Sequence, residues 1–280
     1  YYDFPAIDSL ILALQPNAII FSDGGPGCRW VGNERGIAGE TNWSFLKGAE
    51  VYPGYPRFQE LPSGHEDGDA WIPAECDVSI RPGWFWHADE DTLVKTPEQL
   101  LDLYFKSVGR NANFLLNVPV NRDGLISGAD SASLYGFNEL LAREFPCNLL
   151  QGSNVTVNVS SERGRDFRAE NMTDGDFDTY WSVPDGTGAA YAEFVFGVPE
   201  RLDKMVLQEY IPLGQRVVDF DVEYLSDGKW LPLDCGEETS TIGYKRILRF
   251  APVTADGVRV IFKESRGPVC VSAVEAFLRH

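Results

Sequence analysis

The stretch TPEQLLDLYFKSVGRNANFLLNV, residues 96–118, decides how the first half of the chain folds. Thr96, Pro97 and Gln99 form a capping box with proline at the first helical position, which predicts the start of a helix. The apolar face of that helix is supplied, at helical spacing, by Leu100, Leu101, Tyr104, Phe105 and Val108. The run 114–118 has the composition of a buried strand, so the stretch predicts one helix–strand unit.

The same alternation of helix and strand extends over residues 1–147. Helices are predicted at 7–14 and 134–145, and further strands within 17–22 and 75–80. Short connections between them imply parallel strands. The long polar and aromatic loops follow strands, which favours a (β/α)8 barrel with its catalytic face at that end. About three strands are visible, whereas a complete barrel has eight and needs about 250 residues, so we expect only the C-terminal portion of a barrel.

Residues 148–280 change to alternating apolar and polar positions. Half-buried strands are predicted at 191–196, 204–209, 218–224 and 258–262. Turns rich in glycine, proline and aspartate separate them, which favours an antiparallel β-sandwich of about 130 residues. The predicted fold class is therefore α/β plus all-β, with a partial (β/α)8-type barrel over 1–147 and a β-sandwich over 148–280.

The composition excludes several classes of partner. The formal net charge of −18 over 280 residues would be repelled by nucleic acid or by an anionic membrane surface, and it suits a neutral substrate. No run of 18 apolar residues is present, so we expect no membrane insertion. The five cysteines lie far apart without a CxxC pair, which argues against zinc and leaves at least one free thiol; a single bridge stays possible.

A carboxylate with catalytic character follows the first predicted strand. The segment Arg-Trp-Val-Gly-Asn-Glu, residues 29–34, places Glu34 in a loop near Trp30. An aromatic wall of low dielectric keeps a carboxyl group protonated near neutral pH, and retaining glycosidases need such a group to protonate the leaving oxygen. The alternative is a solvated glutamate in a polar surface loop.

The segment Arg-Pro-Gly-Trp-Phe-Trp-His, residues 81–87, gathers aromatic and hydrogen-bonding side chains in one loop. Pyranose rings stack their C–H faces on aromatic rings and hydrogen-bond to charged groups. We therefore predict a substrate-binding set that consists of Trp30, Arg81, Trp84, Trp86 and His87. The alternative, burial in barrel packing, is expected for about half of the aromatic residues.

An acidic loop in the second part offers hard oxygen ligands. Residues 174–181 read Asp-Gly-Asp-Phe-Asp-Thr-Tyr-Trp, and clustered carboxylates suit calcium. The spacing is not that of an EF-hand, because glycine is not at the sixth position and Asp185 stands at the twelfth. An acidic turn without a metal explains the loop equally well.

Three motifs in the first part resemble one enzyme family. They are IIFSDGGPGCRWVGNERGIAGETNW (19–43), WIPAECDVSIRPGWFWH (71–87) and SVGRNANFLLNVPVNRDGL (107–125). They resemble family 29 α-L-fucosidases, and most closely the branch that cleaves α-1,3 and α-1,4 fucosyl linkages. The resemblance implies that Glu34 is the general acid/base. It also implies that Arg81 and Trp84 lie in or beside the fucose pocket.

Residues 148–280 resemble a discoidin-like module, also called factor 5/8 type C or family 32 carbohydrate-binding module. The resemblance is carried by AENMTDGDFDTYW (169–181), LQEYIPLGQRVVDFDVEY (207–224) and VSAVEAF (271–277). In such modules a structural calcium sits at the Asp-Gly-Asp loop and a late glutamate closes the site. The implied ligands are Asp174, Asp176, Thr179 and Glu275.

The family resemblance implies a retaining exo-α-L-fucosidase whose aspartate nucleophile lies upstream of residue 1. Retention needs two carboxyl groups about 5–5.5 Å apart, of which Glu34 supplies one. We therefore expect a missing N-terminal barrel segment as partner, a fucosylated oligosaccharide or glycoconjugate as substrate, no cofactor for catalysis and an extracytoplasmic location. The alternative is a non-catalytic carbohydrate-binding or structural protein whose relevant part is the sandwich.

Overall fold

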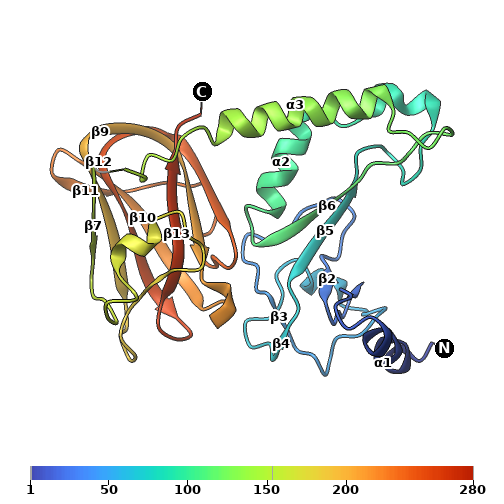
Figure 1. Cartoon of the computed structure of the whole chain (residues 1–280), viewed down its shortest axis with the longest axis horizontal. Coiled ribbons are helices and arrows are strands. Elements are labelled where there is room, and N and C mark those ends of the chain that lie inside the picture. Colours follow the sequence, from blue (N-terminus) through green and yellow to red (C-terminus); the bar gives the residue numbers. More distant parts are fainter. Residues whose placement is uncertain (1, 153, 280) are drawn as a thin grey trace.

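The computed structural model describes residues 2–152 and 154–279, which form two parts. The antiparallel strands of the second part lie on the left of Figure 1, and the parallel strands of the first part lie on the right. Helix α3 (Gly128–Glu144) crosses the top of the molecule towards the sandwich, whereas α1 (Phe4–Leu14) lies at the far end. The boundary predicted at residue 147 falls in the connection between α3 and the first sandwich strand.

A four-stranded sheet in the order β1-β2-β5-β6 is the frame of the first part, and every neighbouring pair in it is parallel. The strands are β1 (Phe21–Ser22), β2 (Cys28–Trp30), β5 (Ala74–Ser79) and β6 (Ala112–Asn117). The partial barrel is confirmed, with one strand more than predicted. Strand β2 escapes a periodicity search because it has three residues, one of them the charged Arg29.

The helices of the first part begin and end close to the predicted positions. Helix α2 (Pro97–Ser107) starts with the predicted capping box, in which the side chains of Thr96 and Gln99 accept hydrogen bonds from each other's backbone N–H groups. It packs through Leu100 and Leu103 against Val78 of the sheet. Helix α1 forms as predicted, but none of its 11 residues is buried.

Short elements occupy the long loops of both parts. Strands β3 (Phe45–Leu46) and β4 (Ala70–Trp71) pair with each other in antiparallel orientation. The 3-10 helices are Phe58–Glu60, Ala88–Leu93, Ala169–Met172 and Ile211–Leu213.

Long antiparallel strands build the second part. Its strands are β7 (Val155–Val159), β8 (Trp181–Ser182), β9 (Ala190–Glu209), β10 (Val217–Ser226), β11 (Lys229–Pro232), β12 (Arg246–Ser265) and β13 (Cys270–Phe277). Strands β9 and β12 pair along both of their halves, with register shifts between 249 and 257. One half of β9 pairs with β13 and the other with β7, so the two long strands serve both layers of the sandwich. The β-sandwich is confirmed, although the segments predicted as separate strands at 191–196 and 204–209 are one strand.

The sandwich has a core of its own. Trp181, Phe194, Phe220 and Phe262 are almost completely buried between its layers. Each such side chain contributes roughly 1.5–3 kcal/mol relative to an exposed position. The sheet of the first part instead rests on several small clusters along one face.

A seam of buried amides joins the two parts. Asn111, with φ of 58°, donates from Nδ2 to the Asn42 carbonyl (3.1 Å) and to Ser44 Oγ (3.0 Å). Its Oδ1 accepts from the backbone N–H of Tyr244 in the sandwich, at 2.8 Å. Close approach of the backbone here requires Gly243, because a Cβ at that position would lie 2.2 Å from Asn111 Cγ. We call the contacts of Asn42, Asn111 and Arg246 between the two parts the seam.

Arg246 is the charged member of the seam. Its Nη1 donates to the Glu40 carbonyl and its Nη2 to the Glu238 carbonyl, both at 2.6 Å. Glu237 bridges Arg246 and Arg110, with N–O distances of 3.2 and 2.9 Å. The two Nη atoms of Arg246 thus donate to both parts of the chain at once, whereas its buried Nε has no partner among the described residues.

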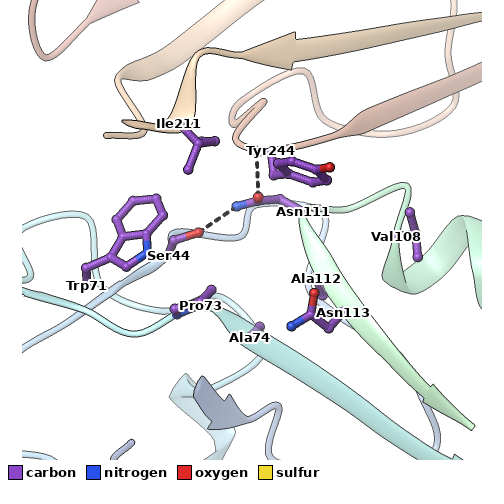
Figure 2. A pocket seen from close by; sticks show the side chains of 10 residues that line it. All are labelled: Ser44, Trp71, Pro73, Ala74, Val108, Asn111, Ala112, Asn113, Ile211 and Tyr244. Carbon is purple, nitrogen blue, oxygen red and sulfur yellow. Dashed lines mark hydrogen bonds between the residues drawn. The ribbon is translucent and has the colours of Figure 1, made fainter. Parts of the chain in front are cut away.

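A cavity of about 230 Å³ lies beside the seam, at the amino ends of β5 and β6. Figure 2 shows Trp71 on one side of it, and Ile211 and Tyr244 of the sandwich above Asn111. In α/β barrels the catalytic loops follow the carboxyl ends of the strands. This cavity is therefore at the opposite end of the sheet from Glu34.

The state of the cysteines agrees with the sequence analysis, which leaves at least one free thiol. All five cysteines lie in the described part of the chain and are free thiols, so the bridge that was left possible is not formed. Burial raises the pKa of Cys76 to about 12, as expected for an unreactive core thiol. Among residues 2–152 and 154–279, no helix has the length and apolar content needed to cross a membrane.

Replacing Arg246 tests the strength of the seam. We expect Arg246→Met to lower the free energy of unfolding by about 1–3 kcal/mol, because it leaves two partly buried carbonyls short of a donor and removes one of the two cations that pair with Glu237. Urea denaturation measures this change. Arg201→Met, at an exposed position of β9, is the matched control and should change the stability by less than about 0.5 kcal/mol. Equal stability of the two variants would contradict a structural role for the seam.

Glu209 makes the stability of the sandwich depend on pH. Its buried carboxylate accepts from the N–H groups of Arg216 (2.7 Å), Val217 (2.9 Å) and Gly243 (2.7 Å), and burial raises its pKa to about 7. The folded protein therefore binds more protons than the unfolded chain between pH 4.5 and 7, so stability falls as the pH rises through this window. We expect Glu209→Gln to remove this slope. The melting temperatures of the unsubstituted protein and of Glu209→Gln, measured from pH 5 to 8, test this expectation. The same dependence on pH in both proteins would contradict it.

Candidate active site

One face of the parallel sheet is open and carries polar side chains. On β5, Cys76 and Val78 point into buried clusters, so Glu75 and Asp77 lie on the opposite face. Cys28 Sγ contacts Glu75 Oε2 at 3.5 Å across this face. We call it the open face, defined by Cys28, Trp30, Glu75, Asp77 and Leu115.

Glu34 is presented by a tight turn at the carboxyl end of β2. Gly32 takes a φ of 82°, and a Cβ there would lie 2.3 Å from the Phe58 carbonyl oxygen. Asn33 braces the turn, because its Nδ2 donates to the Ile37 carbonyl (2.9 Å) and its Oδ1 accepts from Arg35 N (3.1 Å). The glutamate side chain itself is exposed, where a substrate can reach it.

Trp84 is the aromatic neighbour of Glu34. Its Nε1 donates to Glu34 Oε2 at 3.2 Å. Its loop is held by the strand ends, since Ser79 Oγ donates to the Gly83 carbonyl (2.6 Å) and Asn117 Nδ2 donates to the Trp84 carbonyl (3.0 Å). The structure thus brings Glu34 together with Trp84, rather than with the expected wall, Trp30.

Trp30 forms a hydrogen bond with a second carboxylate, that of Asp77. Its Nε1 donates to Asp77 Oδ1 at 2.9 Å, and its ring lies 6.4 Å from that of Phe58. Burial raises the pKa of Asp77, and the charges of Glu34 and Glu75 add to this effect. The carboxyl groups of Glu34 and Asp77 are therefore electrostatically coupled parts of one site.

Arg81 has a different place from the predicted one. Its side chain is fully buried and pairs with Asp130 (3.0 Å) and Asp91 (2.6 Å). It also donates to Ser127 Oγ (2.8 Å) and to the His87 carbonyl (3.0 Å). All three guanidinium nitrogens are occupied within the protein, so we reassign Arg81 from sugar binding to holding the 81–91 loop.

The other members of the predicted set divide between the interior and the surface. The Trp86 ring lies 6.0 Å from the Arg81 guanidinium, and its buried Nε1 has no hydrogen-bond partner among the described residues. His87 is exposed beside it. Trp84 is the aromatic residue of this loop that contacts Glu34.

The predicted calcium ligands do not assemble into one site. Asp174 Oδ2 accepts from Thr179 Oγ1 (2.7 Å), and Asp174 Oδ1 from Asp176 N (2.8 Å), so the acidic loop satisfies itself. Glu275 instead lines a cavity of about 440 Å³ between the two parts, together with Tyr104 and Lys245. No group of three or more His, Cys, Asp or Glu residues that could hold a metal ion occurs in the described ranges. The resemblance to discoidin-like modules implied this set. A motif does not show which way a strand side chain points, so the position of Glu275 could not be read from it.

The sequence analysis did not single out three residues that shape the site: Asp77, Ser79 and Asn117. A signal was present, because Glu75, Asp77 and Ser79 alternate with the apolar residues of their strand. Polar residues at every second position predict a polar face, even on a strand whose other face is buried.

The chain was also compared with known protein families and proteins. A family model of the F5/8 type C domain matches residues 156–275. The chain is 38% identical over 285 residues to α-L-fucosidase 1 of Arabidopsis thaliana, and 40% identical over 280 residues to a candidate α-L-fucosidase 1 of Oryza sativa subsp. japonica. Both alignments cover 99% of this chain, which spans about half the length of these curated relatives, 54% and 53% respectively.

A solved structure extends the likeness to the fold of the whole chain. A GH29 fucosidase of Ruminococcus gnavus in complex with fucose matches with a TM-score of 0.88 and 31% identity. The match covers 100% of this chain and 58% of that one. The fold is a partial (β/α) barrel joined to a β-sandwich that matches the F5/8 type C domain. The chain is thus similar over its whole length to α-L-fucosidases, which confirms the resemblance of its motifs to family 29.

Proposed function

We propose that this chain is part of a retaining exo-α-L-fucosidase with Glu34 as its general acid/base. One observation carries the proposal. A turn at the carboxyl end of a barrel strand presents Glu34 beside Trp84 Nε1, at 3.2 Å, in a chain similar to a fucosidase solved with fucose. We propose terminal α-1,3- and α-1,4-linked fucose of glycans as the substrate, on the resemblance of the Trp-Val-Gly-Asn-Glu motif.

The proposed reaction uses two carboxyl groups and no cofactor. A carboxylate from outside this chain attacks the anomeric carbon, while Glu34 gives its proton to the leaving glycosidic oxygen. Glu34 then takes a proton from water, and the resulting hydroxide releases fucose from the covalent intermediate. The exposed position of Glu34 gives both the leaving oxygen and the water access to it.

The partner that supplies the nucleophile is proposed to be an N-terminal barrel segment. Strands β1 and β6 form the two edges of the parallel sheet, and Leu115 on the open face is 45% exposed. On α1, Leu10 and Leu14 are 60% and 69% exposed. Unpaired strand edges and apolar patches require a cover, and further parallel strands of one barrel would provide it.

Glu34→Gln tests the acid/base role in the protein expressed with any sequence that precedes Tyr1 in its gene. We expect kcat/KM for α-1,3- and α-1,4-fucosylated oligosaccharides to fall by about 10²–10⁴-fold, because an amide cannot give the proton. Fucose release from oligosaccharides with α-1,2, α-1,3 and α-1,4 linkages measures both the loss and the linkage preference.

Glu66→Gln is the matched control, since Glu66 is an exposed glutamate of the same part of the chain. It should leave kcat/KM unchanged. A Glu34→Gln enzyme as active as the Glu66→Gln enzyme would refute the acid/base assignment, and equal rates on all linkages would refute the proposed preference.

A second candidate function is glycan binding by the sandwich. The loops at one end of the sandwich surround a cavity of about 400 Å³, whose lining includes Phe167 and Tyr180. Tyr180 stacks on Tyr210 at 4.2 Å between ring centroids and lies 5.0 Å from Phe167. Arg163 and Asp185 form a two-pronged ion pair at the rim, at 2.8 and 2.9 Å. Aromatic rings beside hydrogen-bonding groups are suited to a sugar.

Glycan-array binding of the Glu34→Gln protein tests this second function. We expect Tyr180→Ala, added to that protein, to abolish binding, because it removes the centre of the aromatic stack. Tyr135→Ala is the control, at an exposed position of α3. If no glycan is bound, or if both tyrosine variants bind equally, the sandwich has no such site and serves to hold the partial barrel.

A further inference from the structure

The proposed acid/base chemistry leaves two carboxylates of the open face unused, Glu75 and Asp77, and Asp77 is the one held by Trp30. Asp77 lies on β5, one strand further along the sheet than β2, which leads into the Glu34 turn. Its backbone neighbours Cys76 and Val78 point into the packed face, so its own side chain points to the open face. There it is only partly buried.

The carboxylate of Asp77 is held in place by a hydrogen bond to one of its oxygen atoms. Oδ1 accepts from Trp30 Nε1 at 2.9 Å. Its own backbone N–H also hydrogen-bonds to the carboxylate, and among residues 2–152 and 154–279 no side chain other than Trp30 donates to it. Trp30 is itself braced by the Phe58 ring, with centroids 6.4 Å apart.

Among the residues that the structure describes, the surroundings of Asp77 supply negative charge, and no ion pair joins its carboxylate to a cation. Glu34 faces it from the turn after β2, and Glu75 from its own strand, and both charges act on it. Arg29, the cation of the neighbouring strand, points away and donates to the carbonyls of Leu61 and Ile72. A partly buried carboxylate without a cation is stabilised only by hydrogen-bond donors, and sugar hydroxyls are such donors.

The position of Asp77 within its strand decides which sugar of the substrate can contact it. Asp77 is a strand residue, whereas Glu34 and Trp84 belong to loops beyond the strand ends. A sugar whose glycosidic oxygen lies at Glu34 therefore places its ring, rather than the leaving group, over Asp77 and Trp30. The indole of Trp30 then provides an apolar wall beside the carboxylate.

We propose that Asp77 is a specificity-determining residue that accepts a hydrogen bond from one ring hydroxyl of the terminal sugar, with Trp30 as its orienting partner. This inference rests on the proposed fucosidase function and adds to it a contact that selects the hydroxyl pattern of the sugar. A structural role for Asp77, limited to fixing Trp30, is the competing explanation.

Deoxygenated substrates separate the two explanations. The protein, expressed with any sequence that precedes Tyr1 in its gene, is assayed on an aryl α-L-fucoside and on its 2-, 3- and 4-deoxy analogues. We expect Asp77→Ala to lower kcat/KM for the parent fucoside by about 10–100-fold, the usual effect of losing a hydrogen bond to a charged group. For one of the three analogues the same substitution should cost almost nothing, because the hydroxyl that Asp77 binds is already absent.

Asp77→Asn supports the test if the alanine variant does not fold, because the amide keeps an acceptor for Trp30 Nε1 but has no charge. We expect Asp77→Asn, like Asp77→Ala, to lower kcat/KM for the parent fucoside but not for the deoxy analogue that lacks the bound hydroxyl. Glu75→Gln, two residues away on the same face, is the control and should lower kcat/KM for all four substrates by one common factor or not at all. Melting temperatures of the variants show whether each is folded.

Each outcome decides one proposal. An equal loss on all four substrates in Asp77→Ala and Asp77→Asn would overturn the contact and leave Asp77 a structural residue, while the fucosidase function stands. A wild-type protein that cleaves no fucoside would overturn the proposed function, and the Asp77 contact with it.

Discussion

The buried contact between Asn42 and Asn111 is the constraint on which the rest of the structure depends. Each amide hydrogen-bonds to the backbone of the other residue's segment, and Asn111 also accepts from Tyr244 of the sandwich. Gln215, another sandwich residue, donates to the Asn42 carbonyl at 2.9 Å. Because Asn42, Asn111 and Gln215 are buried, separating the two parts would leave several of these polar groups without partners, which is strongly unfavourable.

This constraint reaches the candidate active site through one loop. Asn42 and Glu34 belong to the same connection between β2 and β3, and Asn42 Oδ1 accepts from Arg29 Nη2 at 2.7 Å. The sandwich therefore fixes one end of the segment that presents the proposed proton donor, while strand β2 fixes the other. The F5/8 type C domain thus helps to hold the loop that carries Glu34, because Thr241 and Gln215 hydrogen-bond to the backbone of Asn42.

The electrostatics of the open face follow from the same architecture. Parallel strands place the side chains of β2 and β5 side by side, so Trp30 meets Asp77 and Cys28 meets Glu75. The positive charge of this region is directed elsewhere: Arg29 points to the packed face, and Arg81 is buried with Asp91 and Asp130. A face with carboxylates, indoles and no paired cation suits a neutral polyhydroxylated ligand better than an anionic one.

Local patterns in the sequence determined the helices, the capping box at Thr96, the change from α/β to all-β near residue 147, and the motif around Glu34, because each depends on residues close together in the chain. Tertiary structure alone decided the roles of side chains that meet across strands. Arg81 forms an ion pair with Asp130, and Trp30 donates a hydrogen bond to Asp77. Glu275 lines a cavity together with Lys245 and does not join the acidic loop. The physical reason is that a side chain's partner is set by strand register and by the path of distant loops, neither of which is encoded in nearby residues.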